Sequence, residues 1–230
     1  MRLGGYQKLT LLDFPGRVAC TVFTDGCNLR CPFCHNASLV LDMGAKPYLE
    51  ENDFFTFLKG RIGLLDGVAI TGGEPLMQPG ILDFIKKIKE MGYAVKLDTN
   101  GTSPHILRTI LEEKLVDYVA MDIKNCPEKY AETTDVPGLD LSKIEESIAL
   151  LTSHDTPFEF RTTVVREFHT KEDLVKISHW IPKDVNYFLQ SFVDSGELIG
   201  SNVSGYSPDE MRELIAAVRE TIPGANLRGV

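Results

Sequence analysis

The sequence lacks an excess of basic residues and has no long hydrophobic run. Its 24 lysines and arginines are outnumbered by 33 aspartates and glutamates, which gives a formal net charge of −9 at pH 7. This balance argues against a broad nucleic-acid surface, which would normally show a basic excess. No apolar stretch, at the N-terminus or later, reaches the length of a signal peptide or a membrane span. We therefore expect a cytoplasmic protein that binds neither nucleic acid nor a membrane.

Cysteine is scarce, and its distribution argues against a disulfide framework. There are 5 cysteines, an odd number, and Cys27, Cys31 and Cys34 are too closely clustered to form a set of bridges. Metal ligation in a reducing compartment is the better interpretation. Cys20 lies inside an apolar run and is expected in the core. Cys126 lies near the expected site, but the sequence does not favour a reactive role for it.

The three clustered thiols stand at C-x3-C-x2-C spacing within residues 27–34, here called the cysteine loop. A four-iron cluster has four corners, so a loop with three thiolates leaves one iron open to a ligand that is not protein. A structural zinc site is one alternative, but no second C-x2-C pair or nearby H-x3-H pair exists, and His35 could be a fourth ligand only in a contorted loop. A redox pair of Cys31 and Cys34 is another, but it leaves Cys27 unexplained. The spacing favours the cluster.

Apolar, β-rich runs alternate with stretches of helical periodicity along the chain. Its 230 residues, 43% of them hydrophobic, suit a single domain spanning residues 1–230. We expect six core strands at 18–23, 67–71, 94–98, 117–122, 158–165 and 187–189, with a last short strand near 226–229. We expect helices near 50–60, 79–91, 104–114, 141–152, 171–180 and 208–221. Repeated βα units predict an α/β fold with a parallel sheet, either an open doubly wound sheet or a partial barrel.

Two of the expected helices begin with capping signals. Thr170 stands three residues before Asp173, which is a cap with an acid in the first turn. Ser207 is followed by Pro208 at the first helical position and by Glu210 at the third. These two helix starts are the most sharply defined in the sequence.

Four motifs follow expected strands. They are the cysteine loop, Gly72-Gly73-Glu74-Pro75, Thr99-Asn100-Gly101 and Ile123-Lys124-Asn125. In parallel α/β folds the loops after the strands gather on one face and bind ligands there, so we expect the motifs to meet. Gly72 and Gly73 would let a ligand approach backbone amides closely, and Glu74 adds a carboxylate suited to an amino group. A plain strand-ending turn is the alternative.

Charged and polar side chains mark the ends of the third and fourth strands. Asp98, Thr99 and Asn100 carry oxygen atoms at the end of one strand. Asp122 and Lys124 face the same side if the next strand continues, because side chains alternate with a period of two. An ion pair and an ordinary Asn-Gly turn would explain the same residues without a ligand.

Arg161 is a charge within an otherwise β-branched, buried strand. Such a charge is seldom tolerated without an anionic partner. The partner could be a ligand carboxylate, Glu159 or another buried acid. Histidines offer no comparable signal, because those near helix ends or on helices are expected at the surface or its boundary: His105, His154, His169 and His179.

Taken together, these motifs resemble those of the radical S-adenosylmethionine superfamily. The residues that carry the resemblance are Cys27, Cys31, Phe33 and Cys34, followed by Gly72-Gly73-Glu74. Further segments resemble the glycyl radical enzyme activating proteins: Leu11-Leu12-Asp13-Phe14-Pro15-Gly16, Cys34-His35-Asn36, Asp98-Thr99-Asn100-Gly101 and Asp122-Ile123-Lys124. The whole-chain pattern is most similar to the activating proteins of anaerobic ribonucleoside-triphosphate reductase.

The resemblance implies a partial (β/α)6 barrel in which Cys27, Cys31 and Cys34 hold a [4Fe-4S] cluster. Its open iron would chelate the amino and carboxylate groups of S-adenosylmethionine. Electron transfer into the sulfonium would release methionine and a 5′-deoxyadenosyl radical, which takes a hydrogen atom from a glycine of the partner. Such chemistry needs no general acid or base, which agrees with the absence of a convincing catalytic histidine.

The resemblance also implies roles for individual residues. Those expected to bind the cofactor are Gly72, Gly73 and Glu74 at the amino group, Phe33 at the adenine, and Lys124 and Arg161 at the carboxylate or ribose, with Asn100 in the same stretch. Positions that line a monovalent cation site in related enzymes are matched by Asp98, Thr99 and Asp122. Some related enzymes carry a histidine after the sixth strand, where this chain has Leu189-Gln190-Ser191-Phe192.

The implied partner is a glycyl radical enzyme, anaerobic ribonucleotide reductase in the first place. The chain has no added ferredoxin-like cysteine cluster, so a flavodoxin or ferredoxin would have to supply the electron. Two alternatives stay open at this point. One is a small-molecule radical enzyme such as a 7-carboxy-7-deazaguanine synthase, and the other is a non-catalytic metal-binding or redox-sensing module.

Overall fold

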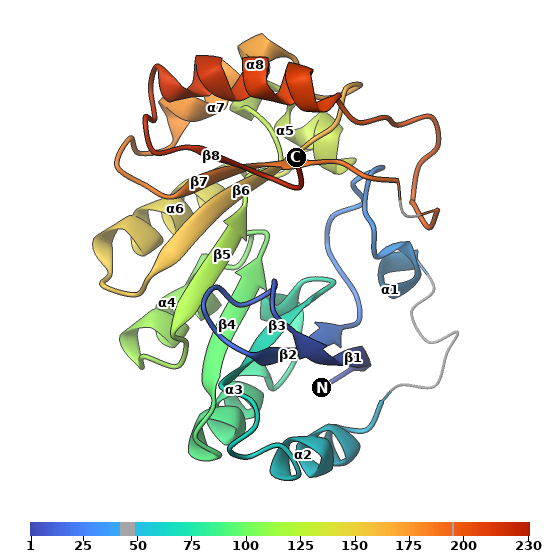
Figure 1. The fold of residues 1–230 in the computed structure, drawn as a ribbon, viewed down its shortest axis with the longest axis vertical. Coiled ribbons are helices and arrows are strands. Elements are labelled where there is room, and N and C mark those ends of the chain that lie inside the picture. The colour runs from blue at the N-terminus through green and yellow to red at the C-terminus, as the bar shows by residue number, and fades with distance from the viewer. Residues whose placement is uncertain (42–48, 195) are drawn as a thin grey trace.

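The computed structural model describes residues 1–41, 49–194 and 196–230, which form one curved sheet with helices around it (Figure 1). In chain order the strands are β1 (Leu3–Thr10), β2 (Ala19–Thr24), β3 (Gly67–Gly72), β4 (Ala94–Thr99), β5 (Tyr118–Asp122), β6 (Phe158–Val164), β7 (Tyr187–Ser191) and β8 (Asn226–Arg228). They are hydrogen-bonded in that same order, antiparallel between β1 and β2 and parallel between all later neighbours. A doubly wound sheet reverses its strand order at a switch point, and this sheet does not, so the fold is a partial barrel.

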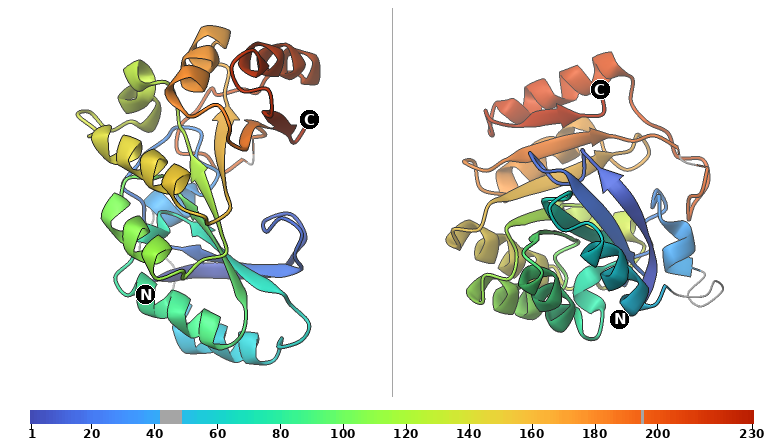
Figure 2. Two further views of the ribbon diagram at one scale, coloured as in Figure 1. Left: turned by 90° about the vertical axis from the view of Figure 1, so that its left-hand side faces the viewer. Right: turned by 60° about the horizontal axis from the view of Figure 1, so that its bottom comes forward.

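Helices cover the outer face of the sheet (Figure 2). The helical elements of the described residues are α1 (Ala37–Leu41), α2 (Glu51–Lys59), η1 (Pro75–Met77), α3 (Ile81–Glu90), α4 (Pro104–Glu112), α5 (Pro127–Thr134), α6 (Ser142–Ser153), α7 (Lys171–Trp180) and α8 (Pro208–Arg219). Alternation along each strand separates the two faces. On β4, Val95 and Leu97 belong to the apolar core, whereas Lys96 and Asp98 point to the inner face. None of the described helices is long and apolar enough to span a bilayer.

All six expected core strands and all six expected helices are present, and so is the short last strand. Both capping boxes are confirmed, since Thr170 accepts from the Asp173 amide and Ser207 from the Glu210 amide. The sequence analysis missed β1, α1 and α5. The choice that it left open, between a doubly wound sheet and a partial barrel, is decided in favour of the barrel.

Candidate active site

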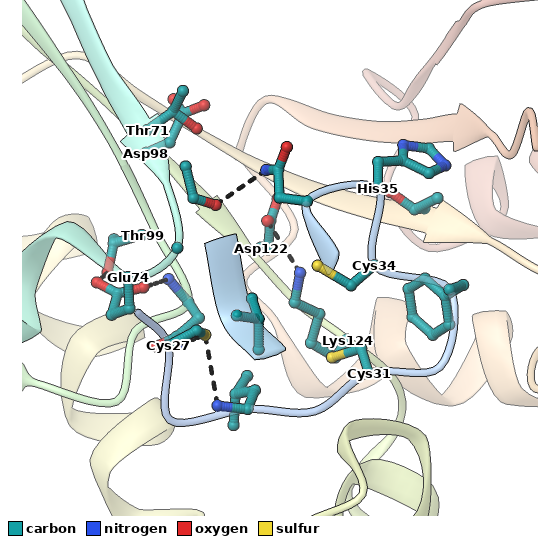
Figure 3. A pocket seen from close by; sticks show the side chains of 18 of the residues that line it. Cys27, Cys31, Cys34, His35, Thr71, Glu74, Asp98, Thr99, Asp122 and Lys124 are labelled. Carbon is teal, nitrogen blue, oxygen red and sulfur yellow. Dashed lines mark hydrogen bonds and ion pairs between the residues drawn. The ribbon is translucent and has the colours of Figure 1, made fainter. Parts of the chain in front are cut away.

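The cysteine loop follows β2 and lies at the mouth of the barrel (Figure 3). The Arg30 guanidinium donates to the Cys27 carbonyl at 2.6 Å, which holds the first half of the loop. The Arg30 amide donates to the Thr134 carbonyl at 2.9 Å. From the long segment between β7 and α8, the Gly200 amide donates to the Pro32 carbonyl at 2.7 Å. The loop is therefore fixed by contacts from distant parts of the chain.

Apolar side chains surround the three thiols. Those buried around the loop are Leu29, Phe33, Val165 and Phe192, together with Cys31 itself. Burial raises the pKa of Cys27 to about 11 and the pKa of Cys31 to about 12, so both are protonated at neutral pH in the free protein. Metal centres bind thiolates, so loading a cluster would release these protons.

One cavity unites all the residues that the sequence assigned to the site (Figure 3). They are Cys27, Cys31, Phe33, Cys34, Gly72, Gly73, Glu74, Asp98, Thr99, Asn100, Asp122, Lys124 and Arg161. The cavity holds about 950 Å³ of space between the atoms, its open mouth included. Three thiols on one loop beside such a cavity are a donor set that fits a four-iron cluster with one open iron. No set of three His, Cys, Asp or Glu side chains in the described residues has the geometry of a site for a single metal ion.

Seven further residues line the cavity and were not assigned to it from the sequence: Leu29, His35, Asn36, Val40, Thr71, Thr163 and Gln190. His35 and Asn36 adjoin Cys34, and that proximity was a usable signal. Asn36 also donates to the Gly72 carbonyl at 2.9 Å, which ties the end of the cysteine loop to β3. Thr163 and Gln190 reach the cavity through the register of β6 and β7, where they are paired, and for Gln190 the family resemblance after the sixth strand was a usable signal.

Glu74 is buried and joins the ends of β3 and β4. Its carboxylate accepts hydrogen bonds from the Thr99 hydroxyl at 2.7 Å, the Asn100 amide at 2.7 Å and the Leu76 amide at 3.1 Å. Burial raises the pKa of Glu74 to about 7, although these donors act in the opposite direction. The Glu74 side chain thus joins the loop after β3 to the loop after β4, and it also lines the cavity.

The glycines of the Gly72-Gly73 turn serve a close approach between loops. Gly72 has φ +109°, and a Cβ at Gly73 would meet the Gly26 carbonyl oxygen at 2.0 Å. The Gly73 amide donates to Thr24 and the Glu74 amide to Gly26, at 2.9 and 2.8 Å. The amides of Gly73 and Glu74 therefore do not point to a ligand, because both donate hydrogen bonds within the chain. An amino group is itself a donor and needs acceptors, which carbonyl and carboxylate oxygens supply.

A chain of alternating charges crosses the inner wall from β4 to β6. Lys96 pairs with Asp98, and Asp98 also receives the Arg161 guanidinium at 3.3 Å. Arg161 donates to Asp122 at 2.9 Å, and Lys124 pairs with the other Asp122 oxygen at 3.0 Å. The partners of the buried arginine are thus two acids on neighbouring strands, whereas Glu159 is not among them.

These contacts set the protonation of the wall. Burial alone would raise the pKa of Asp122, but Arg161 and Lys124 overcome it and lower that pKa to about 2. Burial opposes ionisation of Asp98 too, yet Arg161 and Lys96 hold its pKa below the usual value. The pKa of Lys124 is raised, because the attraction of Asp122 exceeds the cost of burial. Asp98, Asp122 and Lys124 are therefore charged at neutral pH.

Glu159 has a separate set of partners. Arg228 of β8 binds its carboxylate through two nitrogens at 2.8 and 3.1 Å, and the Tyr118 hydroxyl donates to it at 2.9 Å. The Arg228 guanidinium also lies over the ring of Phe188, 4.1 Å from its centre. This cluster attaches the last strand to the inner wall.

The prediction of a surface position for His169 is wrong. The residue is fully buried, with Nε2 2.7 Å from the Lys124 carbonyl and Nδ1 3.1 Å from the Val165 amide. Its ring lies edge-on to Phe33 of the cysteine loop. The other three histidines of that group are at the surface or its boundary, as expected. Cys20 and Cys126 are buried in the main core.

Comparison with known proteins places this geometry in a family. Residues 21–181 match the radical SAM superfamily. A provisionally named glycyl-radical enzyme activating enzyme of Methanocaldococcus jannaschii is 33% identical over 197 residues, which are 83% of this chain and 79% of that protein. The pyruvate formate-lyase-activating enzyme of Clostridium pasteurianum is 35% identical over 130 residues, 54% of this chain and 52% of that protein.

Other relatives act on small molecules or share only the fold. The GTP 3′,8-cyclase of Alkaliphilus oremlandii is 32% identical over 171 residues, which cover 71% of this chain and 53% of that enzyme. Streptococcus suis SuiB bound to S-adenosylmethionine superposes with a TM-score of 0.63 at 15% identity, over 88% of this chain and 48% of SuiB. Native anSMEcpe with bound AdoMet gives a TM-score of 0.60 at 20% identity, over 85% and 57%. Apart from the archaeal relative, this chain spans about half the length of each of these proteins.

Proposed function

This chain belongs to the radical S-adenosylmethionine superfamily, and we propose that it is an activating enzyme that generates a radical on a glycine of a partner protein. The main support for this proposal is that the thirteen site residues line one cavity at the mouth of the barrel. The archaeal relative, which is named for the same activity and aligned over 83% of this chain, supports the proposal. So does the similarity to pyruvate formate-lyase-activating enzymes.

A [4Fe-4S] cluster with S-adenosylmethionine would supply reductive cleavage of the sulfonium to methionine and a 5′-deoxyadenosyl radical. The thiolates of Cys27, Cys31 and Cys34 would hold that cluster. Phe33 and its buried neighbours would shield the loop side of the cluster from water. Glu74 and the turn before it orient the amino group, and Arg161 and Lys124 present positive charge to the carboxylate.

We infer that the partner is anaerobic ribonucleotide reductase and that a flavodoxin or ferredoxin in the cytoplasm delivers the electron. The whole-chain motif series supports this partner. A second candidate is a small-molecule radical enzyme, which the cyclase relatives favour. They match this chain over only about half of their own length, so the glycine-activating role remains our proposal.

The test of this function is an anaerobic electron paramagnetic resonance experiment. The reconstituted, reduced protein is mixed with S-adenosylmethionine and the anaerobic ribonucleotide reductase of the same organism, and 5′-deoxyadenosine is quantified in the same tube. A glycyl doublet on the reductase is the expected result. Formation of 5′-deoxyadenosine without the glycyl doublet would assign the radical chemistry to another substrate. A cluster-loaded protein that yields neither 5′-deoxyadenosine nor the doublet would contradict the enzyme proposal.

Replacing Glu74 by glutamine should weaken S-adenosylmethionine binding and leave the cluster in place. The glutamine side chain keeps one acceptor oxygen, but its NH2 group would face the Thr99 hydroxyl or the Asn100 amide, both of which are donors. The substitution also removes the negative charge that would face the amino group of S-adenosylmethionine. Hydrogen bonds to charged groups contribute about 1.5–3 kcal/mol, so we expect affinity to fall roughly 10- to 100-fold. Calorimetric titration of the cluster-loaded protein measures the affinity, and iron analysis checks the cluster.

The matched control is Glu146→Gln, which alters an exposed carboxylate that pairs with Arg108 at the surface. This variant should bind S-adenosylmethionine like the unaltered protein. Equal affinity in Glu74→Gln and the control would remove the proposed role of Glu74.

A further inference from the structure

The family resemblance implies a monovalent cation beside the cofactor. We propose that in this chain the ammonium group of Lys96, on β4, supplies that positive charge in place of a bound ion. Cofactor binding by this chain would then be independent of K⁺ and Na⁺. The statement about the cofactor rests on the proposed function. The statement about the cation does not, because it concerns only how the inner wall is neutralised.

Lys96 is one of the most deeply buried charges of the protein. Its side chain is 2% exposed, and its ammonium pairs with Asp98, two residues further along the same strand. Both side chains leave β4 on the inner face, because they are two residues apart. A buried lysine is rare unless it is paired, so this ammonium is part of the wall and not a solvated surface group.

The residues expected to hold a cation are already occupied by groups of the chain. Asp98 directs one carboxylate oxygen to Lys96 and the other to Arg161. Asp122 directs one to Arg161 and the other to Lys124. The Thr99 hydroxyl donates to Glu74 and accepts from the Gly101 amide. Each carboxylate oxygen thus already faces a cationic group of the chain, and an added cation at these oxygens would lie against an ammonium or guanidinium.

Charge balance opposes an additional ion. The wall combines the cations of Lys96, Arg161 and Lys124 with the anions of Asp98 and Asp122, which leaves one positive charge. Two further acids belong to the surroundings of the wall: Glu159 is neutralised by Arg228, and Glu74, which accepts from Thr99, has a pKa raised by burial to about 7. Like charges repel, so a wall that already holds three cationic side chains disfavours another cation. The single excess charge suits one ligand carboxylate.

The experiment compares cations at constant ionic strength, with KCl, NaCl, ammonium chloride or choline chloride at about 0.1 M. For the unaltered protein we expect S-adenosylmethionine affinity and the melting temperature of the cluster-free protein to be the same in all four salts. Lys96→Met should bind the cofactor about 10-fold or more weakly in choline chloride, because Asp98 loses a buried partner. Potassium or ammonium should restore most of that loss and raise the melting temperature of the variant. Lys89→Met, which breaks a half-exposed pair with Asp117, is the matched control and should show no such salt preference.

Two outcomes would overturn the proposal. One is a cation-specific gain in affinity or melting temperature by the unaltered protein. The other is a Lys96→Met variant that is equally weak in every salt. Should this variant fail to fold, crystals of the unaltered protein soaked in RbCl decide, because an anomalous peak at the Asp98 and Asp122 oxygens contradicts the proposal and its absence supports it. A protein that binds no S-adenosylmethionine would refute the proposed function, while the melting and scattering measurements would still test the role of Lys96.

Discussion

Cys31→Ala should form no 5′-deoxyadenosine above background and should retain little iron after anaerobic reconstitution. Cys31 is the middle of the three thiols and the most deeply buried of them. With alanine there, two thiolates would remain for a cluster that needs at least three protein ligands to leave one iron for the cofactor. Chromatography of the reaction products and iron analysis measure the two effects. We expect the same loss from Cys27→Ala and Cys34→Ala.

The two remaining cysteines provide matched controls. Cys20 and Cys126 are fully buried in the main core, and the Cys126 thiol also donates a weak hydrogen bond to the Asp173 carboxylate at 3.8 Å. Cys20→Ala and Cys126→Ala should cost about 1 kcal/mol of stability and keep most of the iron and the activity. Activity retained by the Cys31→Ala protein would contradict the cluster assignment. Loss of activity in the controls as well would mean that any cysteine replacement disturbs the fold.

Arg161→Met should lower the free energy of unfolding of the cluster-free protein by about 3–5 kcal/mol at neutral pH. The arginine neutralises Asp98 and Asp122 together, and methionine fills a similar volume without charge. Both acids would remain in the wall, with only Lys96 and Lys124 to balance them. Urea unfolding followed by circular dichroism measures the difference. Arg166→Met, which removes an exposed pair with Glu210, should change stability by no more than about 1 kcal/mol.

The difference between Arg161→Met and the unaltered protein should depend on pH. In the folded protein the pKa of Asp122 is about 2, below the value of about 3.9 in an unfolded chain. A depressed pKa contributes stability that is present above the unfolded value and is lost as the pH falls through the folded one. The difference should therefore be greatest near neutral pH and shrink between about pH 5 and pH 2. A difference that stays constant over this range would show that the arginine acts through packing and not through charge.

Most of the fold followed from hydrophobic periodicity, and its failures have local causes. The central strands are nearly continuous apolar runs, which is typical of parallel strands buried on both faces. The first strand, β1, is antiparallel, carries Gly4 and Gly5 and is mostly exposed, so it shows no such run. Helix α5 is polar on most positions, since only Tyr130, Thr133 and Thr134 are buried. Its stability comes from packing against the rest of the chain, which local sequence does not express.

The residues of the site also divide into those that the sequence predicts and those that it does not. Residues in contiguous motifs after strands were predicted, because chain connectivity alone brings those loops to one face. The partners of Arg161 were left open, since its contact with Asp122 depends on the register between β5 and β6, where the two residues are paired. The buried position of His169 was missed, because its hydrogen bonds reach the backbone of a strand end 45 residues away. The pairing of Lys96 with Asp98 was missed, although the period of two along β4 puts both side chains on one face.

The contact between Gly200 and Pro32 has a consequence for how the protein is made. The cysteine loop is translated early, but its outer support comes from the segment before α8, about 170 residues later. At roughly 5–20 residues per second, a ribosome needs on the order of 10–30 s to cover that distance. During this interval the nascent thiols lack the cover that later shields them. We therefore expect iron and sulfide to reach a fully supported loop only after this later segment has been made.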